Sequence, residues 1–578
     1  MATTTQELAQ EWLRLDQDPS TRAEVEALLA KDDLSELDQR MRQRIAFGTA
    51  GLRATMGAGF SRMNALTVIQ ASQGLAAYLL ETVSDVEKRG VVIGRDARFN
   101  SEKFACLTAA AFMAKNIRVH WLGQVHTPLV PYTVNQMNAA AGVMVTASHN
   151  PAADNGYKVY WSNGCQIIPP VDVGIANAIV NNLEPLTWDI STVNNTNPLM
   201  SNALDMVQGP YMAAVAKAAN LRQVSTSIPF VYTPMHGVGL PFFTAALQNL
   251  RLELDMHVVK DQAEPDPTFR TVHFPNPEEK GALDLAKQVA DGEGITLILA
   301  NDPDADRFAV AEKVDGAWRQ ITGNQMGVLL ASYILETYEP TPKSKGLAML
   351  ASTVSSKMLA RMAAVSQKFH FEETLTGFKW LGNKAQDLHA AGYDALYAYE
   401  EAIGYMFSEA GVFDKDGVSA ATVFLAACHK WHDSGLTPWS KYQQLCREYG
   451  YFEEANTYLI SPSPDITNTV FSEIRENRPS VVGKRSILRW RDLTVGLDTG
   501  TPDQKPLLPV DASSQMISCE VEGHVQFTVR GSGTEPKIKL YIEGSASTPQ
   551  EAKAAAEEVL EALVREWFNP EHNNLKLA

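Results

Sequence analysis

Short apolar runs, each bounded by loop residues, recur between helical patterns from about residue 64 to about residue 430. The runs are continuous rather than alternating, so strands formed by them would be buried on both faces under helices. They are GVVIG (90–94), AAGVMVTA (140–147), IPFVYTP (228–234) and GITLILA (294–300). This pattern predicts an α/β fold with mostly parallel sheets.

The last part of the chain has a different pattern. VQFTVR (525–530) and KIKLYIEG (537–544) flank a Gly/Pro loop, which is typical of two paired strands. Thr548-Pro549-Gln550-Glu551 then reads as a capping box with proline at the first helical position. We therefore expect a separate C-terminal α+β domain that ends in a helix.

The composition limits the compartment and the partners. Asp+Glu total 67 against 50 Lys+Arg, a net charge of −17 over 578 residues, so the chain repels nucleic acid and acidic membrane surfaces. The five cysteines are scattered without a CxxC pair, which favours reduced thiols in a reducing compartment. The N-terminus does not resemble a signal peptide, and no run of about 18 apolar residues is present to span a bilayer. We expect a cytoplasmic protein in which any anionic substrate meets locally clustered arginines and lysines.

One polar motif follows the apolar run that begins at residue 140. It reads Thr146-Ala147-Ser148-His149-Asn150-Pro151, at the strand end where open α/β sheets bind ligands. Ser148 would be an exposed hydroxyl beside His149, with Lys158 ten residues further along. A polar turn would have the same composition, because Ser, Asn and Pro are common turn residues. The motif alone does not separate these two interpretations.

A second motif, Asp302-Pro303-Asp304-Ala305-Asp306-Arg307, follows the run that ends at residue 300. Three carboxylates at alternate positions can turn toward one point and supply the hard oxygen ligands that Mg²⁺ prefers. Such a site keeps open positions for a phosphate oxygen. We predict a metal site here rather than a solvated acidic turn.

Other stretches are less specific. Arg530-Gly531-Ser532-Gly533-Thr534 lies between two expected strands and suits either a phosphate cradle or a plain hairpin loop. His429 and His432, in HKWH, have the spacing of a metal pair, but no carboxylate pattern accompanies them, so we predict a surface helix. GxxxxGKS/T, GxGxxG and GxSxG are all absent, which removes the usual support for P-loop, Rossmann and α/β-hydrolase interpretations.

Taken together and in order, five motifs resemble the α-D-phosphohexomutase superfamily: TASHNP, DPDADR, TGFK, EEAIG and RGSGTEP. The resemblance runs from about Phe47 into the C-terminal part of the chain, and FGTAGLR with TASHNPAADNGYKVYW is most similar to the phosphopentomutase branch that has phosphoglucomutase side activity. It implies four domains around a central cleft, three related α/β domains with mixed sheets and a C-terminal α+β domain. The boundaries we expect are 1–208 (phosphoserine loop), 209–323 (metal loop), 324–452 (sugar loop) and 453–578 (phosphate loop).

The resemblance also implies roles for individual residues. Ser148 matches the phosphorylated serine and would also be a metal ligand, and Asp302, Asp304 and Asp306 match the Mg²⁺ ligands. Three positions near the phosphoserine that assist proton transfer match Arg53, His149 and Lys158. The substrate-binding positions match Arg307, Thr376, Gly377, Lys379, Glu400, Arg530, Ser532, Gly533 and Thr534.

The implied activity is a Mg²⁺-dependent isomerase, an intramolecular phosphotransferase that interconverts aldose 1-phosphates with 5- or 6-phosphates through a phosphoserine and a bisphosphate primer. Ribose, deoxyribose and glucose phosphates are the candidate substrates. Hexose-specific members typically carry Glu-x-Ser in the sugar loop, whereas this chain has Glu400-Glu401-Ala402. A methyl group forms no hydrogen bond, which favours a smaller sugar. A sugar bisphosphate synthase and a phosphohydrolase stay open as alternatives, as does the choice between monomer and dimer.

Overall fold

The computed structural model describes residues 3–221, 227–250, 255–532 and 537–577. The chain forms two compact units, and each is built from two separate stretches of sequence. The first contains Met1–Leu350 with Gly377–Trp439, and the second contains Ala351–Thr376 with Ser440–Ala578. These units do not delimit the four sequence domains, whose boundaries stay a prediction.

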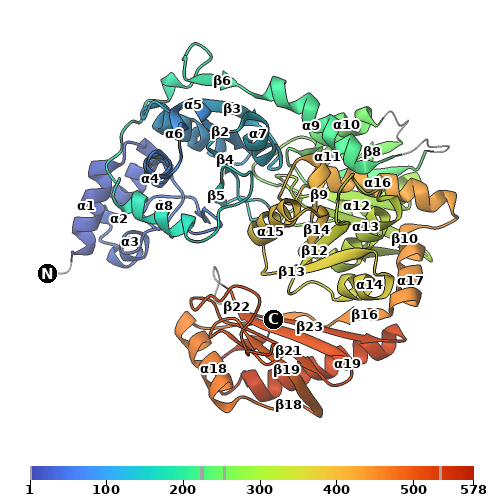
Figure 1. Ribbon diagram of the computed structural model, residues 1–578. Coiled ribbons are helices and arrows are strands. Elements are labelled where there is room, and N and C mark those ends of the chain that lie inside the picture. The colour runs from blue at the N-terminus through green and yellow to red at the C-terminus, as the bar shows by residue number, and fades with distance from the viewer. Residues whose placement is uncertain (1–2, 222–226, 251–254, 533–536, 578) are drawn as a thin grey trace. The chain divides into compact units, whose positions relative to one another are not determined.

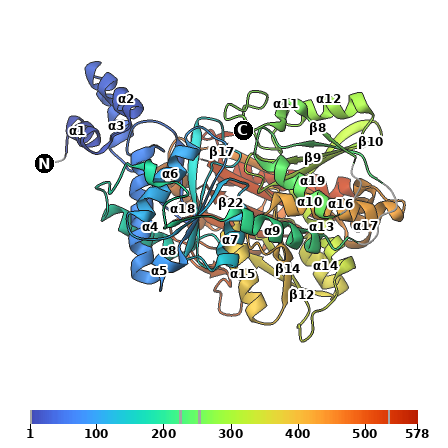
Figure 2. The same cartoon turned by 90° about the horizontal axis from the view of Figure 1, so that it is seen from above.

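The first unit begins with a small helical cluster that lies apart from the first sheet in both views (Figures 1 and 2). Trp12 is its centre, with its side chain fully buried and its ring edge-on to Phe60 at 5.1 Å between centroids. Thr4 and Glu7 form a capping box that starts the first helix. The helices are α1 (Thr5–Leu15), α2 (Pro19–Ala30) and α3 (Leu34–Met41).

The first sheet is mixed and has the order β1-β5-β4-β2-β3-β6. Its β2, β3, β4 and β6 run parallel, while β5 is antiparallel to both β4 and β1. The strands are β1 (Leu52–Thr55), β2 (Val91–Arg95), β3 (Val119–Gln124), β4 (Ala141–Val145), β5 (Asp154–Tyr160) and β6 (Met200–Asn202). The helical segments are α4 (Ala65–Thr82), α5 (Val86–Arg89), α6 (Ser101–Met113), α7 (Leu129–Met137), α8 (Val171–Val180), the 3-10 turn η1 (Ile190–Thr192) and α9 (Leu204–Ala219).

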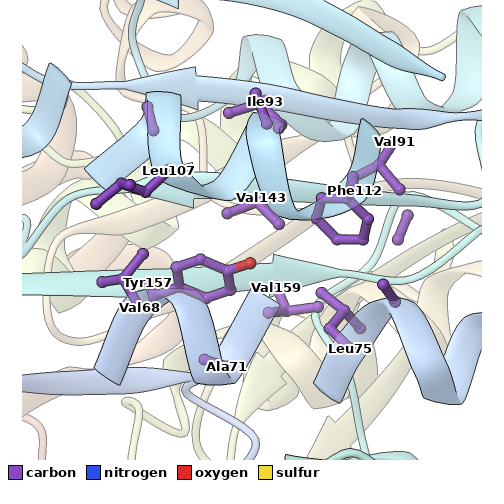
Figure 3. Packing of buried hydrophobic residues seen from close by; sticks show 14 of the residues in the cluster. Val68, Ala71, Leu75, Val91, Ile93, Leu107, Phe112, Val143, Tyr157 and Val159 are labelled. Atoms are coloured by element: carbon purple, nitrogen blue, oxygen red, sulfur yellow. The ribbon is translucent and has the colours of Figure 1, made fainter. Parts of the chain in front are cut away.

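The core of this sheet fits the prediction of strands covered by helices. Figure 3 shows side chains from β2, β4 and β5 packed against residues of α4 and α6. Val143 is completely buried in this cluster, as are Ile93 and Leu75. The uninterrupted apolar runs of the sequence therefore correspond to strands without a solvent-facing side.

The second sheet has the order β11-β10-β9-β7-β8, with β7 parallel to both β8 and β9. The antiparallel strands β10 and β11 complete it. Its strands are β7 (Phe230–Thr233), β8 (Met256–Val258), β9 (Leu297–Asn301), β10 (Phe308–Val314) and β11 (Ala317–Ile321). The accompanying helices are α10 (Gly239–Asn249), α11 (Lys260–Ala263) and α12 (Asp284–Glu293).

The rest of the first unit includes a hairpin and a long, mostly buried helix. The hairpin pairs Glu400 with Gly404 at its turn. The elements are α13 (Gly323–Thr337), β12 (Leu347–Ser352), α15 (Phe378–Ala390), β14 (Asp394–Glu400), β15 (Gly404–Phe407), the 3-10 turn η2 (Ser408–Ala410) and α16 (Gly417–Asp433). The chain then forms α17 (Pro438–Tyr449).

The second unit is built on an antiparallel sheet of order β18-β19-β21-β22-β23-β17-β24, with β16 beside β23 and β20 beside β19. The predicted hairpin is confirmed, because β22 and β23 are antiparallel partners. The strands of this sheet are β16 (Tyr451–Glu454), β17 (Thr457–Ile460), β18 (Val481–Val482), β19 (Arg485–Asp492), β20 (Leu497–Asp498), β21 (Met516–Val521), β22 (Val525–Gly531), β23 (Lys537–Ala546) and β24 (Lys576–Leu577). The unit also contains β13 (Phe369–Thr374), which is not part of this sheet. The helices are α14 (Met358–Ser366), α18 (Pro464–Asn477), α19 (Pro549–Ala562) and the π-helical turn η3 (Leu563–Phe568).

The predicted start of the last helix is also confirmed. Thr548 caps α19 by accepting from the Glu551 N–H, and Pro549 occupies the first helical position. Within the part of the chain that the structure describes, we find no helix with the length and apolar character needed to cross a bilayer.

Candidate active site

Ser148 lies in a loop that begins where β4 ends. Its backbone is left-handed, with φ at 53°, and its N–H donates to Thr146 Oγ1 at 2.9 Å. A non-glycine residue held in this region is strained and needs support from its surroundings. The residue is only 2% exposed, so the expectation of an exposed hydroxyl is wrong: the loop folds back against the aspartates and covers it. The loop therefore presents the hydroxyl in one fixed direction.

Arg98 supplies much of that support. Its guanidinium donates to the carbonyl oxygens of Ser148, Asn150 (2.6 Å) and Pro151 (2.8 Å). A buried ion pair with Asp96, 3.2 Å between Nε and Oδ2, balances its charge. The N–H groups of Arg98 thus hold the backbone of the loop in place. This residue was not identified from the sequence.

The second loop follows β9 and carries the three aspartates, each fully buried. Ala305 sits in the left-handed region with φ at 49°, and this turns the loop so that one oxygen of each carboxylate lies within 4.8 Å of the others. Two glycines hold the loop from outside. A Cβ on Gly237 would lie 2.3 Å from Pro303 Cα, and the Gly417 N–H donates to the Ala305 carbonyl at 3.1 Å.

The two loops meet through Ser148. Its Oγ donates to Asp302 Oδ2 at 2.8 Å and lies 3.3 Å from His149 Nδ1. Lys158 Nζ, on β5, donates to Asp304 Oδ2 at 2.7 Å and to Asp306 Oδ2 at 2.6 Å. The structure thus brings together the predicted hydroxyl, histidine, lysine and carboxylates, although Ser148 and Asp302 are 154 residues apart in sequence.

The remaining carboxylate oxygens fit a metal ion. Asp304 Oδ1 and Asp306 Oδ1 are buried and have no hydrogen-bond partner among the described residues. Burial and the neighbouring Asp304 and Asp306 raise the pKa of Asp302 well above its ordinary value. Burial alone would raise the pKa of Asp304, but Lys158 and Thr127 hold it below the usual range. Three converging carboxylates with unsatisfied oxygens in a buried loop can hold a hard divalent cation.

Two further residues at this loop were missed in the sequence. Thr127 donates its hydroxyl to Asp304 Oδ2 at 2.5 Å and its N–H to the Asp304 carbonyl at 2.9 Å. Lys415 Nζ lies 3.0 Å from Asp306 Oδ2. Both come from segments remote in sequence. The only local signal is the run Asp414-Lys415-Asp416-Gly417 before α16, a charged cluster ahead of a long apolar helix.

Glu400, the predicted sugar-binding carboxylate, ends β14. It is 8% exposed, and burial raises its pKa to about 7 although Lys415 acts in the opposite direction. Gly404 opposite it allows close packing, because a Cβ there would lie 3.2 Å from Glu400 Cγ and 3.0 Å from Lys415 Cδ. Near neutral pH this group can therefore either donate or accept a hydrogen bond.

Arg307 directly follows the aspartates. Its N–H donates to Asp302 Oδ1 at 3.0 Å, and its carbonyl accepts from the Asn301 amide at 2.6 Å. Burial would lower the pKa of Arg307, but Asp302 and Asp306 raise it, so the guanidinium keeps its charge. The side-chain Nε has no hydrogen-bond partner among the described residues. A buried cation with a free donor can bind an anionic substrate.

The other predicted residues of the first unit lie on β1, in the loop after β4, and at the start of α15. Arg53 is exposed, and its guanidinium donates to Asn150 Oδ1 at 3.3 Å. Burial, with Arg307 and Arg53 nearby, holds the pKa of His149 well below its ordinary value, so the imidazole is neutral at pH 7. Gly377 has φ at 108° and precedes α15, whose Lys379 donates to Thr49 Oγ1.

Five predicted residues belong to the second unit, and the structure describes three of them. Thr376 Oγ1 is buried without a hydrogen-bond partner among the described residues. Arg530 lies on β22, with its guanidinium carbon 6.0 Å from the centre of the Tyr541 ring, and the Ser532 N–H donates to the Lys537 carbonyl at 2.8 Å. Gly533 and Thr534 lie outside the described residues.

Comparison with known proteins agrees with this geometry. Phosphoribomutase of Saccharomyces cerevisiae is 46% identical over 606 residues, covering 98% of this chain and 96% of that protein. Phosphopentomutase of Mus musculus is 44% identical, covering 99% and 96%, and glucose 1,6-bisphosphate synthase of Homo sapiens is 39% identical, covering 98% and 94%. A solved phosphoglucomutase/phosphomannomutase family protein of Burkholderia thailandensis shares the fold, with a TM-score of 0.66 at 16% identity over 90% of this chain and 98% of that one.

Family models match most of the sequence. The α/β/α domains I, II and III of phosphoglucomutase/phosphomannomutase match residues 44–185, 209–316 and 322–449, and the C-terminal domain of that family matches 517–562. Each carries at least one motif that we identified in the sequence. The chain belongs to the phosphoglucomutase/phosphomannomutase family.

Proposed function

We propose that this protein is a phosphopentomutase that also accepts hexose phosphates. It would move a phosphoryl group between the C1 oxygen and the 5- or 6-oxygen of an aldose phosphate. The observation that carries the proposal is the buried Ser148 hydroxyl, 2.8 Å from Asp302 Oδ2 at the edge of three converging carboxylates. The relatives named phosphoribomutase and phosphopentomutase, at 46% and 44% identity, support the reaction class.

Ser148 is the proposed phosphoryl carrier. In the first half-reaction the bond between phosphorus and Ser148 Oγ breaks, and a new bond forms between phosphorus and the 5- or 6-oxygen of the sugar 1-phosphate. The proton of that sugar hydroxyl passes to a base, and the neutral imidazole of His149 beside Ser148 is a candidate. The product is a sugar bisphosphate, and the departing Ser148 Oγ takes up that proton from the base, so Ser148 regains a hydroxyl.

In the second half-reaction the bisphosphate is bound in the reverse orientation. The bond between phosphorus and the C1 oxygen breaks as phosphorus bonds Ser148 Oγ. The proton of the Ser148 hydroxyl passes through the base to the C1 oxygen, and the sugar 5- or 6-phosphate leaves. A sugar bisphosphate supplied from outside would prime Ser148 in the same way. Positioning and charge stabilisation provide most of the catalysis in such transfers, because the transition state is loose and its charge is spread over oxygens.

We infer that Mg²⁺ is the cation held by Asp302, Asp304 and Asp306, together with an oxygen on Ser148. When bound, Mg²⁺ would neutralise charge on the transferring phosphoryl group. Lys158 and Arg307 add positive charge at the same loop. Thr376, Gly377 and Lys379 would bind sugar or phosphate, and Arg530 and Ser532, with Gly533 and Thr534, would bind the phosphate that is not transferred.

Preference for a pentose rests on the sugar loop. Glu400 would bind a sugar hydroxyl, and Ala402 stands where hexose-specific members typically carry serine. The loss of one hydrogen bond to a hexose hydroxyl leaves a buried polar group less satisfied, which lowers affinity for that sugar. The names of the two most identical relatives cited above are consistent with this.

The test compares kcat/KM for ribose 1-phosphate and glucose 1-phosphate, with Mg²⁺ and a bisphosphate primer, in the wild type, Ser148→Ala and Ala402→Ser. We expect ribose 1-phosphate to be preferred, Ser148→Ala to be inactive, and Ala402→Ser to shift the ratio toward glucose. Full activity of Ser148→Ala would exclude the phosphoserine mechanism. A tenfold preference for glucose 1-phosphate, about 1.4 kcal/mol of transition-state stabilisation, would exclude the pentose preference.

A sugar bisphosphate synthase is the second candidate, favoured by 39% identity to glucose 1,6-bisphosphate synthase of Homo sapiens. This activity would appear as bisphosphate that accumulates only when an external phosphoryl donor is added. Release of inorganic phosphate faster than isomerisation would instead indicate a phosphohydrolase. The mutase proposal requires that neither rate exceeds isomerisation.

We also infer a cytoplasmic location and small sugar phosphates as the binding partners. The five cysteines are all free thiols in the structure, and four of them are buried. Free thiols persist in a reducing compartment. Fractionation of the source cells with an antibody to the chain would test this, and recovery from an oxidising compartment would contradict it.

A further inference from the structure

The backbone of the metal loop (residues 302–307) is held through three consecutive carbonyl groups. Each carbonyl accepts a backbone N–H from a different segment of the first unit: Pro303 from Val238 at 2.9 Å, Asp304 from Thr127 at 2.9 Å, and Ala305 from Gly417 at 3.1 Å. Because the donors are remote from one another in sequence, the path of the loop depends on how each donor is itself fixed. Whatever holds the donors therefore also determines where the aspartate side chains point.

Tyr211, on α9, connects two of these three donor segments. Its hydroxyl donates to Asp416 Oδ2 at 2.9 Å and lies 3.0 Å from His126 Nε2. His126 directly precedes Thr127, and Asp416 directly precedes Gly417. A single hydroxyl thus joins the segments that hold two adjacent carbonyls of the metal loop.

The protons in this chain of hydrogen bonds can be assigned. Burial lowers the pKa of His126 to about 3, so its imidazole is neutral and carries one N–H. Tyr211 has one hydroxyl proton and donates it to Asp416, so its oxygen accepts the proton of His126 Nε2. His126 Nδ1 is then the unprotonated nitrogen, and it is buried without a hydrogen-bond partner among the described residues. Removal of the hydroxyl would take away the partner of both the Nε2–H and the carboxylate oxygen.

The surroundings of Tyr211 leave little room for compensation. His126, Tyr211 and Asp416 are all fully buried. Helix α9 packs against α7, α10 and α16, and Figures 1 and 2 both show it next to α16. A buried polar group that loses its partner costs free energy, and the space left by one hydroxyl oxygen is too small to admit a water molecule readily. The segments on either side would therefore shift.

We propose that Tyr211 is a positioning residue for the metal loop. The inference rests on the proposed Mg²⁺ site and adds a residue that acts on it indirectly. Tyr211 fixes Thr127, whose hydroxyl and N–H both bond Asp304, and it fixes the Gly417 N–H through Asp416. The Asp304 oxygen without a partner among the described residues is thereby kept in the direction that a cation requires.

The first measurement is calorimetric titration of the full chain with Mg²⁺ at pH 8. Groups that bond metal ligands typically change metal affinity ten- to a hundredfold, and Tyr211 lies one contact further out, so Tyr211→Phe should weaken Mg²⁺ binding about three- to tenfold. Tyr397→Phe is the matched control, because its hydroxyl is equally buried and donates to the Gly327 carbonyl at 2.9 Å. The Mg²⁺ affinity of that control should change less than twofold.

Asp416→Asn tests the same hydrogen bond from its other end. Asparagine is among the preferred cap residues, so Oδ1 can still accept from the Val418 and Ser419 N–H groups at the start of α16. Its NH₂ group then faces the Tyr211 hydroxyl and replaces an acceptor by a donor. We expect weaker Mg²⁺ binding, and Tyr211→Phe/Asp416→Asn should bind Mg²⁺ about as well as the weaker single variant, because both changes break one bond.

Hydrogen exchange separates positioning from a general loss of stability. Mass spectrometry with fragmentation to single amides should show at least threefold faster exchange of the Thr127 and Gly417 amides in Tyr211→Phe. The Val238 amide bonds the same loop, but among the described residues no hydrogen bond joins its segment to Tyr211, so its exchange should change less than twofold. Equal acceleration at all three amides would show uniform destabilisation and overturn the positioning role.

The outcomes distinguish this inference from the proposed function. Unchanged Mg²⁺ affinity in Tyr211→Phe would overturn the inference alone, as would additive losses in the double variant. A wild type that binds no Mg²⁺ would overturn the proposed metal site and the inference with it. If Tyr211→Phe fails to fold, the same titration and exchange measurements on Asp416→Asn decide the question.

Discussion

At the scale of single residues, the metal loop depends on a hydroxyl that takes no part in the proposed chemistry. Thr127 donates to the same Asp304 oxygen that Lys158 contacts. This contact orients the carboxylate so that its other oxygen, which has no partner among the described residues, remains free for a cation. Groups of this kind around a metal site affect affinity almost as strongly as the ligands themselves.

Thr127→Val should therefore weaken Mg²⁺ binding ten- to a hundredfold, because the isosteric valine cannot hold Asp304 in place. Calorimetric titration with Mg²⁺ measures this without reference to activity. Thr133→Val is the matched control, since among the described residues that buried hydroxyl bonds only the Leu129 carbonyl of its own helix. Equal Mg²⁺ affinity in the two variants would show that Thr127 does not position the ligand.

The site residues that could be predicted from the sequence lie in short motifs, whereas those that were missed lie far from these motifs along the chain. Ser148, the three aspartates and Lys158 lie in short motifs at strand ends, where residue type and position together indicate chemistry. Thr127 and Arg98 contact the same loops from 177 and 50 residues away. Nothing local distinguishes them from other buried polar residues, so only the tertiary structure reveals them.

At the scale of elements, α16 begins against the metal loop at a glycine. A Cβ on Gly417 would lie 2.3 Å from the Arg307 carbonyl oxygen and 2.8 Å from that of Ala305. Asp416 caps the helix by accepting from the Val418 and Ser419 N–H groups at 3.0 Å. This cap fixes the first turn of α16 in place, so the helix cannot easily move away from the metal loop. The close approach requires glycine.

Gly417→Ala should accordingly displace the metal loop and lower both Mg²⁺ affinity and kcat/KM at least tenfold. Gly292→Ala in α12 is the control, because its Cβ would meet nothing within 4 Å and alanine is favoured over glycine within a helix by about 1 kcal/mol. We expect that control to keep full activity and to melt at the same temperature or higher. Normal Mg²⁺ binding by Gly417→Ala would contradict this account of the helix start.

Elements were more predictable than contacts. The continuous apolar runs became β2, β4, β7 and β9, and the C-terminal hairpin and the Thr548 cap formed as expected. His429 was assigned incorrectly because the polar letters of HKWH hide an asymmetry. His432 of the same turn is exposed, while His429 faces the interior. Which of the two is buried depends on the elements that pack against the helix, and the local sequence does not show this.

At the scale of the whole molecule, the second unit joins two stretches of chain through half-buried carboxylates. Glu373 of β13 lies 2.7 Å from both Lys357 and Arg491, and Glu543 of β23 accepts from the Lys357 N–H at 2.9 Å. Lys357 and Glu373 belong to 351–376, whereas Arg491 and Glu543 belong to 440–578. A sequence read in order does not indicate that these stretches share one unit.

Glu373→Gln should destabilise the second unit at neutral pH. Although burial acts in the opposite direction, Lys357 and Arg491 lower the pKa of Glu373 from 4.5 to about 2. A depressed pKa contributes stability above pH 4.5 that is lost as the pH falls toward 2, and this difference corresponds to at most about 3 kcal/mol. Hydrogen exchange between pH 4 and 7 should show that the β13 amides are less protected in Glu373→Gln than in the wild type. This difference in protection should decrease as the pH falls. Glu476→Gln, at an exposed position, is the control. A loss of protection in Glu373→Gln that did not change with pH would show that the ion pairs of Glu373 are not its cause.

Glu543→Gln should have the opposite effect. Burial raises the pKa of Glu543 from 4.5 to about 7. A raised carboxyl pKa contributes stability below pH 4.5 that is lost as the pH rises through 7, so the wild type carries an unfavourable buried charge at pH 8. The variant should protect β23 amides by up to about 3 kcal/mol more than the wild type at pH 8, and by little at pH 5. Faster exchange of the β23 amides in the variant than in the wild type at pH 8 would show that the ionised Glu543 carboxylate stabilises the fold, contrary to this prediction.

The divided second unit also has a consequence for synthesis on the ribosome. Residues 351–376 emerge before the partner stretch, whose last strand among the described residues, β24, ends at Leu577. About 200 residues separate these events, roughly 10–40 s at 5–20 residues per second. During that interval the nascent chain displays β13 without the segment that supplies Arg491, while the first unit can already complete its fold. The order in which the chain is made therefore completes the second unit after the first.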